Sequence, residues 1–408
     1  MSIFKEIPPT AGLPIYLKDI LSVFNKDNSR DYLEDDLRNF LNINYAKVTC
    51  SGTAAFYLVL ESLKELSTKK TVVIPAFVCP LLPLAIKRAG LKVEICDINR
   101  HDFNFNQVEL GKVCSGNNDI LAIVPVHLGG LPLDFQTIDK FAQKNNIYII
   151  EDCAQALGAS YKGRKIGTLG DFSFFSLCRG KGLTIYEGGL VATNKREYAH
   201  IIDKKIHSLV KDDFFMEGLR ILELFGYWFF YRPQLFWFVY RLPQIFWNLR
   251  GNNFRAMAEY FTTDFPIHKV SKKRKSIGHV SFSRIEDEIA KQREKAIFYL
   301  GGLKEIKGIK AITQQVDTRA TYPYLTLIFD DPETRRKTLK AFDNLGFGVS
   351  VIYACAITDY DYLKDIIPNR DCPNARYMAE REITLSTSTF LNNNDMGSIL
   401  NTIKRLQK

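Results

Sequence analysis

The sequence predicts an α/β protein built on a mainly parallel sheet. Through the first half of the chain, apolar runs of strand length alternate with helical patterns, and this alternation is typical of right-handed βαβ units. The apolar run that ends at Ile150 leads directly into Glu151 and Asp152. Open α/β sheets build their sites beyond the carboxyl ends of their strands, so this run also marks a candidate site.

The expected elements follow one another in a regular order. Residues 17–42 have helical periodicity, and Val48 leads to the small residues 51–54, which immediately precede an apolar helix. The strands and helices expected beyond it are strand 71–74, helix 81–89, strand LKVEICDI, a buried strand running to His127, helix 135–145, strand 147–150, strand 172–175, strand GLVATN and helix REYAHIIDKKIHSL. Farther on, YPYLTLIF, helix 332–345, VSVIY, a helix near 374–382, ITLS and a last helix predict a small C-terminal α/β domain.

Small residues stand immediately before the helix near residue 51. The segment Ser51, Gly52, Thr53, Ala54 leaves free backbone amides at a helix N-terminus, where the helix dipole also favours an anion. This arrangement suits a phosphate group. A helix cap without a ligand explains the same residues.

A second candidate site segment follows strand 172–175. Ser176 and Lys181 lie in a loop flanked by glycines, where a lysine can be desolvated and used as a nucleophile. An acid, a serine and a lysine in these positions are typical of a pyridoxal-phosphate site. Lys181 would hold the aldehyde as a Schiff base, Asp152 would pair with the protonated pyridine nitrogen, and Ser176 would bind the phosphate. Taken singly, the lysine is also explained as a solvated loop charge and the acid as a helix cap.

The stretch EDCAQALGASYKGRKIGTLGDFSFFS, followed by Lys181 and EGG, resembles the DegT/DnrJ/EryC1/StrS family. These are sugar aminotransferases of fold type I that use pyridoxal phosphate. The resemblance implies Asp152 as partner of the pyridine nitrogen, Gln155 as neighbour of the ring hydroxyl, Ser176 as phosphate ligand and Lys181 as the Schiff-base lysine.

Further site residues come from the same resemblance. SGTAAF matches the family segment that holds the cofactor phosphate, which assigns Gly52 and Thr53 to that role. Cys79 stands where many relatives place an aromatic residue on the cofactor ring, with an inward-turned Phe77 as the alternative. His127 and Tyr353 are candidate substrate residues, although a histidine after a strand is more often structural.

The resemblance implies a large domain over residues 1–265, a small domain over 266–408, and a homodimer with sites between its subunits. It also implies amino transfer from a donor, glutamate, to a nucleotide-linked or lipid-linked keto-sugar for cell-surface polysaccharide or related glycoconjugates. One alternative is a sugar dehydratase of the same family, but such relatives carry histidine in place of Lys181. Another is a non-catalytic pyridoxal-binding regulator or membrane scaffold.

The chain departs from the family pattern after residue 265. The asparagine and arginine that relatives lend to the neighbouring subunit are Ile267 and Lys269 here, and the histidine of the family's TSIHYPxPL segment is Ile352. The run KKRK at 272–275 is expected to be a solvated or membrane-facing basic patch.

Residues 213–250 differ in composition from the rest of the chain. They contain all three tryptophans, and Pro233 and Pro243 interrupt any long helix. Their uncharged runs are shorter than the about 20 residues that a spanning helix needs. Aromatic residues with interleaved arginines favour peripheral contact with an anionic membrane. A dimer interface or a lid over the site is the alternative.

Composition limits the compartment and the ligands. The eight cysteines are scattered without a CxxC pair, which predicts reduced thiols in a cytoplasmic protein and no metal site. The start of the chain lacks the pattern of a secretory signal. A net charge of +10 permits attraction to nucleotides, nucleic acid or an anionic membrane, but no nucleic-acid-binding motif accompanies it.

Overall fold

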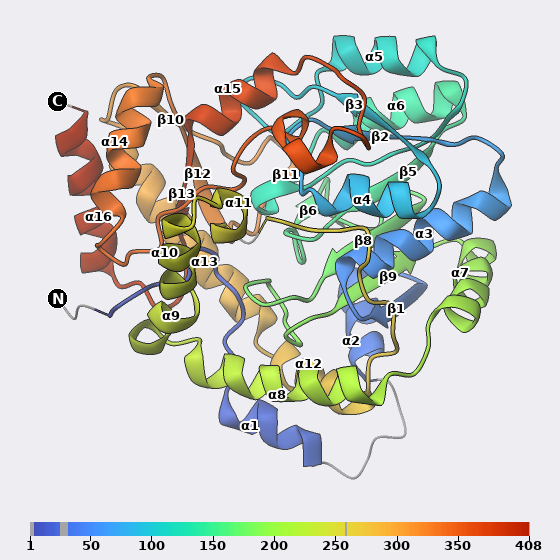
Figure 1. Cartoon of the computed structure of the whole chain (residues 1–408), viewed down its shortest axis with the longest axis horizontal. Helices are drawn as coiled ribbons and strands as arrows, with labels where there is room; N and C mark the ends of the chain where they lie inside the picture. Colours follow the sequence, from blue (N-terminus) through green and yellow to red (C-terminus); the bar gives the residue numbers. More distant parts are fainter. Residues whose placement is uncertain (1–3, 25–31, 258, 408) are drawn as a thin grey trace.

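Two sheets organise the chain. The computed structural model describes residues 4–24, 32–257 and 259–407. Figure 1 shows the larger sheet beside α3 to α7 and the smaller sheet beside α14 and α16. Among the described residues, the larger sheet has seven strands in the order β1-β9-β8-β5-β4-β2-β3. Their bounds are Tyr45–Thr49 (β1), Gly189–Thr193 (β9), Phe172–Ser176 (β8), Tyr148–Asp152 (β5), Ile120–Ile123 (β4), Thr71–Pro75 (β2) and Lys92–Cys96 (β3).

The middle of the large sheet is parallel, which confirms the expected fold class. Strands β8, β5, β4, β2 and β3 pair in parallel, while β9 runs antiparallel between β8 and β1. Strand β5 pairs with β4 on one side and β8 on the other. Its carboxyl end, Asp152, therefore lies between two neighbouring strands, where loops from both sides converge.

Helices alternate with these strands as the sequence predicts. Helix α6 shows how local residues set the limits, because Asp134 accepts the Thr137 N–H at its start and Asn146 adopts a left-handed φ of 50° after its end. The helix α5 was not among the expected elements. The helices of this half are Leu17–Leu21 (α1), Tyr32–Leu41 (α2), Gly52–Leu66 (α3), Leu81–Arg88 (α4), Gln107–Gly116 (α5), Phe135–Asn145 (α6) and Arg196–Leu209 (α7).

Two expectations for this half are corrected. The periodicity of residues 17–42 corresponds to α1, the 3-10 turn Ser22–Phe24 and α2, and residues 25–31 between them lie outside the described residues. The strand expected to run to His127 ends at Ile123. Pro125 follows it without a backbone N–H to donate, and the chain then makes a single isolated bridge from Val126 to Asp152.

The C-terminal part carries an antiparallel sheet in the order β10-β12-β13. Its elements are Lys272–Phe282 (α12), Ile285–Leu303 (α13), Ile309–Ala311 (β10), Tyr324–Phe329 (β12), Pro332–Phe342 (α14), Pro373–Arg381 (α15), Glu382–Ser386 (β13) and Asn393–Leu406 (α16). A small third sheet joins Ser160–Tyr161 (β6), Arg164–Lys165 (β7) and Thr318–Arg319 (β11) in the order β11-β6-β7. The division at residue 265 stays a prediction, and α12 packs on α1 and α2 of the large domain.

The segment VSVIY, expected as a strand of this domain, forms only one bridge, from Ser350 to Thr384. Two carboxylates accept backbone N–H groups that a neighbouring strand would otherwise bind. The Ile352 N–H donates to Glu382 Oε1 at 2.8 Å, and the Ala354 N–H donates to Glu259 Oε2 at 3.0 Å. The segment is therefore held by side chains.

The aromatic insert, residues 213–250, folds as three helices. They are Phe214–Phe230 (α8), Pro233–Val239 (α9) and Arg241–Leu249 (α10), and the short α11, Asn253–Ala256, follows them. Pro233 begins α9 as its first residue, the position that tolerates a proline. Figure 1 shows α9, α10 and α11 beside the C-terminal domain. Within the described ranges, every helix is too short or too polar to cross a bilayer.

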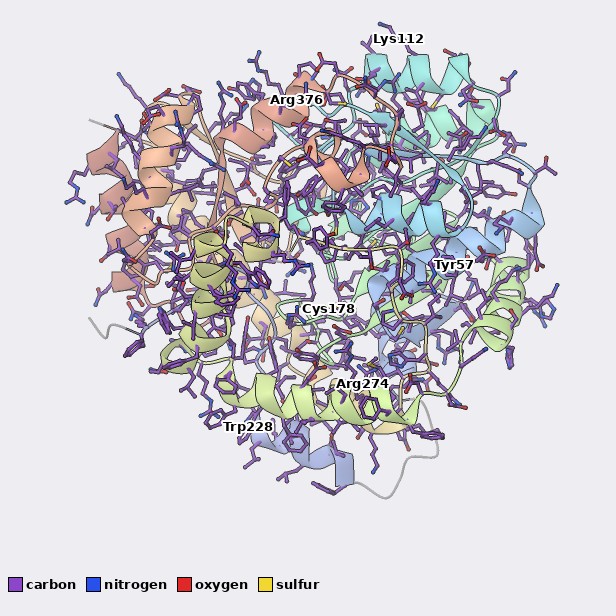
Figure 2. The ribbon with its side chains drawn as sticks, in the orientation of Figure 1. Tyr57, Lys112, Cys178, Trp228, Arg274 and Arg376 are labelled. Atoms are coloured by element: carbon purple, nitrogen blue, oxygen red, sulfur yellow. The ribbon has the colours of Figure 1, made fainter. Side chains whose placement is uncertain are left out.

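The basic run KKRK is only half solvated, which corrects the expectation of a basic surface patch. Lys272 and Lys273 are exposed, but Arg274 is fully buried and Lys275 pairs with Glu34 at 2.7 Å. Arg274 donates through Nε to Glu217 Oε2 of α8 at 3.0 Å, and Figure 2 labels it beside that helix. A buried ion pair thus anchors the start of the insert.

Candidate active site

Asp152, the last residue of β5, is buried beside the loop that carries Lys181. Its Oδ1 accepts the Ala154 N–H at 2.9 Å. Burial raises the pKa of Asp152 to about 6, although the Ala154 N–H, Lys181 and His127 act to lower it. Most of this carboxyl group is therefore ionised at pH 7, and a further cation beside it would favour the ionised form more strongly.

The lysine loop, residues 177–188, extends the hairpin between β8 and β9. The Arg179 N–H donates to the Tyr186 carbonyl at 2.7 Å across the loop. Lys181 lies at its turn, next to Gly180, whose φ is +75°, a value that favours glycine. Across the described residues, no hydrogen bond or ion pair is formed by Lys181 Nζ. The amine is therefore not held by a structural partner.

The N-terminal arm packs against the lysine loop. The Leu13 N–H donates to the Lys181 carbonyl at 3.1 Å. Gly12 is so close to Gly180 that a Cβ on Gly12 would lie 2.7 Å from the Gly180 Cα. Tyr231, which follows α8, accepts the Gly12 N–H at 3.3 Å. Sequence reasoning missed these contacts because they join residues far apart in the chain and no local motif marks them.

The start of α3 meets the end of β8. Ser51 caps the helix by accepting the Ala54 N–H at 3.0 Å, which leaves the N–H groups of Gly52 and Thr53 without intrahelical acceptors. A Cβ on Gly52 would lie 3.3 Å from the Ser176 Cβ. Free amides, the positive end of a helix and a hydroxyl group are thus brought together, as an anion requires.

Gln155 is fixed by its carbonyl oxygen. Gln155 Oε1 accepts the Gly129 N–H at 2.9 Å and the Tyr324 hydroxyl at 2.5 Å. Both contacts use the oxygen, so the amide nitrogen is left to donate elsewhere. Tyr324 belongs to β12 of the antiparallel sheet, so a strand of the C-terminal part positions a side chain that follows β5. No local pattern in the sequence marks Tyr324.

Cys79 lies near the acid and the lysine. Asp152 and Lys181 are among the charges that act on the Cys79 thiol, and burial raises its pKa to about 12. The thiol is therefore neutral at pH 7. Phe77 is fully buried and meets the ring of Tyr353 edge-on, with ring centroids 5.2 Å apart. The cofactor-ring role of Cys79 stays a prediction.

Tyr353 and Glu259 border the same cluster. Cys79, Asp152 and Glu259 all act on the buried Tyr353 hydroxyl, and burial raises its pKa. Glu259 Oε2 accepts the Tyr360 hydroxyl at 2.5 Å. Sequence reasoning missed Glu259. One signal was present in the sequence: residues 224–258 contain neither Asp nor Glu, and Glu259 is the first acid after them.

His127 is held by contacts with the backbone and with Glu151. Its Nδ1 accepts the Leu133 N–H at 3.2 Å, and its Nε2 is 3.4 Å from Glu151 Oε2. Glu151 in turn accepts the N–H groups of Gly167 at 2.9 Å and Leu169 at 2.8 Å. This geometry favours a structural role for His127, whose side chain has no exposed area. Its role in substrate binding stays a prediction.

His127, Glu151 and Cys153 bring three buried ligand atoms within 4.8 Å of one another. The backbone N–H groups that donate to Glu151 compensate for the burial of its carboxylate. Burial raises the pKa of the Cys153 thiol well above its ordinary value. All eight cysteines are free thiols.

The assembled residues fit pyridoxal phosphate. A Cβ on Gly189 would lie 2.3 Å from the Ser51 carbonyl oxygen, so the anion cradle at 51–53 depends on a glycine at 189. Asp152 offers the carboxylate for a ring nitrogen, Lys181 the amine for an aldehyde, and Gln155 the amide for a ring oxygen. Each functional group of that cofactor has a matching group on one side of the sheet.

The model of the DegT/DnrJ/EryC1/StrS aminotransferase family matches residues 21–226 and 268–404. The match covers most of the chain and includes Asp152, Ser176 and Lys181. It stops inside the aromatic insert and resumes after it, so residues 227–267 lie outside the family pattern.

Individual relatives agree with the family match. The chain is 27% identical to the uncharacterized protein MJ1066 of Methanocaldococcus jannaschii over 91% of this chain and 88% of that protein. It is 34% identical to the UDP-4-amino-4,6-dideoxy-N-acetyl-beta-L-altrosamine transaminase of Campylobacter jejuni, over only 44% of this chain and 48% of that protein. The PLP-form structure of the putative sugar aminotransferase Spr1654 from Streptococcus pneumoniae has the same fold, with a TM-score of 0.77, 20% identity and 98% of both chains covered.

Proposed function

The chain belongs to the DegT/DnrJ/EryC1/StrS aminotransferase family, and from this premise we propose that it transfers an amino group from L-glutamate to a keto-sugar with pyridoxal phosphate bound. The keto-sugar is linked to a nucleotide or a lipid, and the amino sugar serves cell-surface polysaccharide or related glycoconjugates. One observation carries the proposal. A buried carboxylate, a lysine amine without a structural partner and an anion cradle converge at the carboxyl end of the central strands.

When bound, pyridoxal phosphate supplies an aldehyde that links to an amine and a ring that takes up the electrons left when a carbon loses its proton. The residues of this chain place and serve that group. The cradle at Gly52, Thr53 and Ser176 would hold the phosphate, and the negative charge of Asp152 would favour a proton on the ring nitrogen. Lys181 Nζ would hold the aldehyde group and would move a proton as general base and acid.

Amino transfer is tested with the full chain loaded with pyridoxal phosphate. We expect a visible absorbance band that bleaches on addition of L-glutamate and returns on addition of 2-oxoglutarate. Lys181→Ala should lose amino transfer by at least about 10²–10⁴-fold, because it removes the group that moves the proton. Lys112→Ala, an exposed lysine on α5, is the matched control and should keep wild-type rates.

Two outcomes would contradict the proposal. A Lys181→Ala enzyme with wild-type transfer would remove the lysine from the reaction. A bound chromophore that ignores every amino donor would favour the non-catalytic regulator or scaffold. The dehydratase alternative lacks support in this chain, because Lys181 stands where such relatives carry histidine.

We also propose a homodimer in which each subunit completes the site of the other. The support is Lys269, which stands where relatives lend an arginine to the neighbouring subunit and whose side chain is 70% exposed. Sedimentation of the loaded protein at micromolar concentration should give twice the mass of the chain. A monomer with full amino transfer would contradict this.

We propose that the aromatic insert faces a membrane, because α10 exposes apolar side chains. Leu242, Ile245, Phe246 and Leu249 form a stripe at helical spacing, and their exposed fractions are 46%, 39%, 46% and 83%. Residues 224–258 contain four arginines and neither Asp nor Glu. An outward apolar stripe with positive charge fits peripheral contact with an anionic bilayer.

A further inference from the structure

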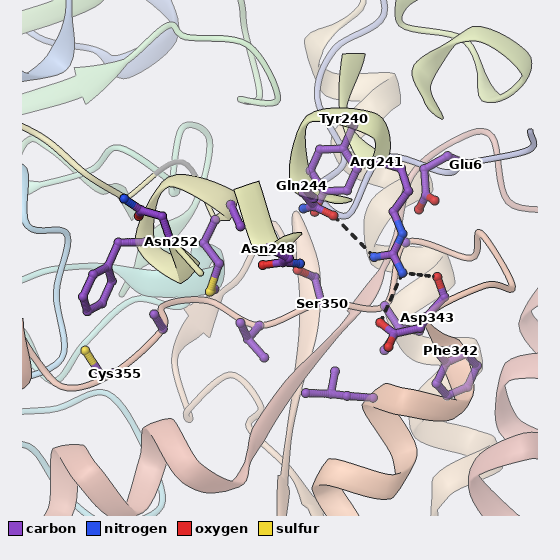
Figure 3. Close-up of a pocket in the computed structure, with 18 of the residues that line it drawn as sticks. Glu6, Tyr240, Arg241, Gln244, Asn248, Asn252, Phe342, Asp343, Ser350 and Cys355 are labelled. Atoms are coloured by element: carbon purple, nitrogen blue, oxygen red, sulfur yellow. Dashed lines mark hydrogen bonds and ion pairs between the residues drawn. The ribbon is translucent and has the colours of Figure 1, made fainter. Parts of the chain in front are cut away.

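A pocket of about 800 Å³ lies between the aromatic insert and the C-terminal domain. Figure 3 shows Gln244, Asn248 and Asn252 on the insert side and Ser350 and Asp343 on the domain side. We call it the insert pocket. Its volume is within the about 300–1,000 Å³ typical of small-molecule sites, and its insert wall lies outside the family match.

The insert wall presents a row of amides. Gln244 and Asn248 are four residues apart and therefore share a face of α10, and Asn252 continues the row beyond the helix end. An amide group both donates and accepts hydrogen bonds, which matches a ligand with several neighbouring hydroxyl groups. Apolar side chains, among them Phe254 and Val349, line the pocket between these polar groups.

Glu6 adds a buried acceptor. Its side chain lines the pocket, the residue is only 8% exposed, and over the described residues its carboxylate has no hydrogen-bond or ion-pair partner. Burial raises the pKa of Glu6 to about 7, although Arg241 lowers it. A buried polar group without a partner is costly, so Glu6 is expected to accept a hydrogen bond from a ligand.

The charges of the insert pocket disfavour an anionic ligand. Arg241 is the one cation among its described lining residues, and it is already paired with Asp343 at 3.3 Å and bonded to Gln244 Oε1 at 3.4 Å. Figure 3 draws these contacts. Glu6 and Asp359 are further carboxylates on the lining, and Asp359 is paired with Arg376 at 2.9 Å. Among the described lining residues, a phosphate group would therefore find no unpaired cation and would face the carboxyl group of Glu6.

A chain of side-chain contacts leads from the insert pocket towards the candidate active site. Phe254 on the pocket side packs against Tyr360, with ring centroids 5.1 Å apart. Tyr360 donates to Glu259, and Glu259 is among the charges that act on Cys79. A ligand in the insert pocket therefore lies next to the wall of the site that holds Lys181.

We propose that the insert pocket binds a neutral, hydroxyl-rich carbohydrate unit through Gln244, Asn248 and Glu6. The choice of a carbohydrate among neutral hydroxyl-bearing ligands rests on the proposed function, while the site itself rests on the pocket. The unit belongs to a larger saccharide than the single sugar that is aminated.

Tryptophan emission offers a readout independent of activity, because all three tryptophans of the chain lie in the insert. The loaded full chain is titrated with a panel of neutral probes: glucose, galactose, mannose, N-acetylglucosamine and their β-1,4-linked disaccharides. Saturation-transfer NMR on the same mixtures shows direct contact. At least one probe should bind, and Gln244→Ala with Asn248→Ala should weaken it about tenfold or more, since two hydrogen bonds are lost.

Glu6→Gln keeps the shape of the carboxylate but not its charge, and it should weaken binding of the same probe. Gln234→Ala removes an exposed amide of α9 outside the pocket and should leave the affinity for the probe unchanged. Lys181→Ala should also leave this affinity unchanged, so a loss of amino transfer and a loss of saccharide binding can be distinguished. Absence of binding by every neutral probe would overturn the proposal. So would binding that none of the pocket variants weakens, or pyrophosphate displacing the saccharide from the pocket.

Discussion

Helices α3 and α10 are both rich in apolar residues, yet they use them in opposite ways. In α3, nine of the fifteen residues are buried, from Gly52 to Leu63. In α10, none of the residues is buried, and the apolar stripe that includes Phe246 faces outward while Gln244 faces the insert pocket. The helical spacing of its apolar residues gives each segment a distinct apolar face. Which face is covered depends on the neighbours that the fold supplies.

The two regions also differ in how they relate to the family pattern. The N-terminus of α3 and the lysine loop lie within the family match, and their polar groups converge on one site. Helix α10 lies outside the match, and its polar groups converge on a second pocket. The comparison predicts that damage to one region leaves the function of the other intact.

The largest effect is expected where the insert joins the core. Arg274→Met removes the guanidinium from the buried carboxylate of Glu217 and, among the described residues, leaves it only the Ser271 N–H and His268. Breaking a buried ion pair costs about 3–5 kcal/mol of unfolding free energy. Urea denaturation of the loaded protein measures it. Lys273→Met, the exposed neighbour, should stay within about 0.5 kcal/mol of wild type.

The double variant Arg274→Met with Glu217→Met should recover much of that loss, because no unpaired charge remains. A single variant Arg274→Met as stable as wild type would mean that the pair does not anchor the insert.

An effect on the cofactor is expected at α3. Thr53→Ala together with Ser176→Ala removes two hydroxyl groups from the proposed anion cradle, and a hydrogen bond to a charged group contributes about 1.5–3 kcal/mol. The Kd for pyridoxal phosphate should rise by well over tenfold, as measured by absorbance after dialysis.

Ser115→Ala, on the exposed surface of α5, is the control for the cradle and should bind the cofactor as wild type does. Unchanged cofactor affinity in the double variant would place the phosphate elsewhere and would remove the functional contrast between α3 and α10.

The smallest effect on stability is expected on the outer stripe of α10. Replacing Leu242, Phe246 and Leu249 with serine removes apolar surface that is already exposed, so each change should alter the unfolding free energy by only about 0.5 kcal/mol or less. The same variant should no longer float with anionic liposomes, since burying such side chains in a bilayer contributes about 1.5–3 kcal/mol each.

Neutral liposomes and a serine variant of the exposed Val108 on α5 are the controls for flotation. If the α10 variant instead falls apart into monomers, the stripe is a subunit interface. If wild-type protein does not float with anionic liposomes, the membrane proposal is wrong.

The three tryptophans show why surface chemistry was harder to predict than the fold. Their concentration in the insert suggested that they face a membrane, but Trp228, Trp237 and Trp247 are all half-buried. Trp237 packs edge-on against Phe4 with ring centroids 5.1 Å apart. The exposed residues are their neighbours on the helices, and composition does not distinguish them.

By itself, the sequence determined the elements and the chemical identities in the site. Apolar runs of strand length and intervening stretches of helical periodicity placed the strands and helices, because these patterns depend on local geometry. The long motif from Glu151 to Lys181 identified the family for the same reason, since its residues act within a short stretch of chain.

Only the tertiary structure decided what those elements contact. Arg274 reads as part of a basic run, yet it is buried because α8 supplies Glu217 from 57 residues away. Glu259 reads as an isolated acid, yet it borders the site because Tyr360 and Ala354 hold it there. Burial and partners depend on residues distant in the chain, and no local pattern records them.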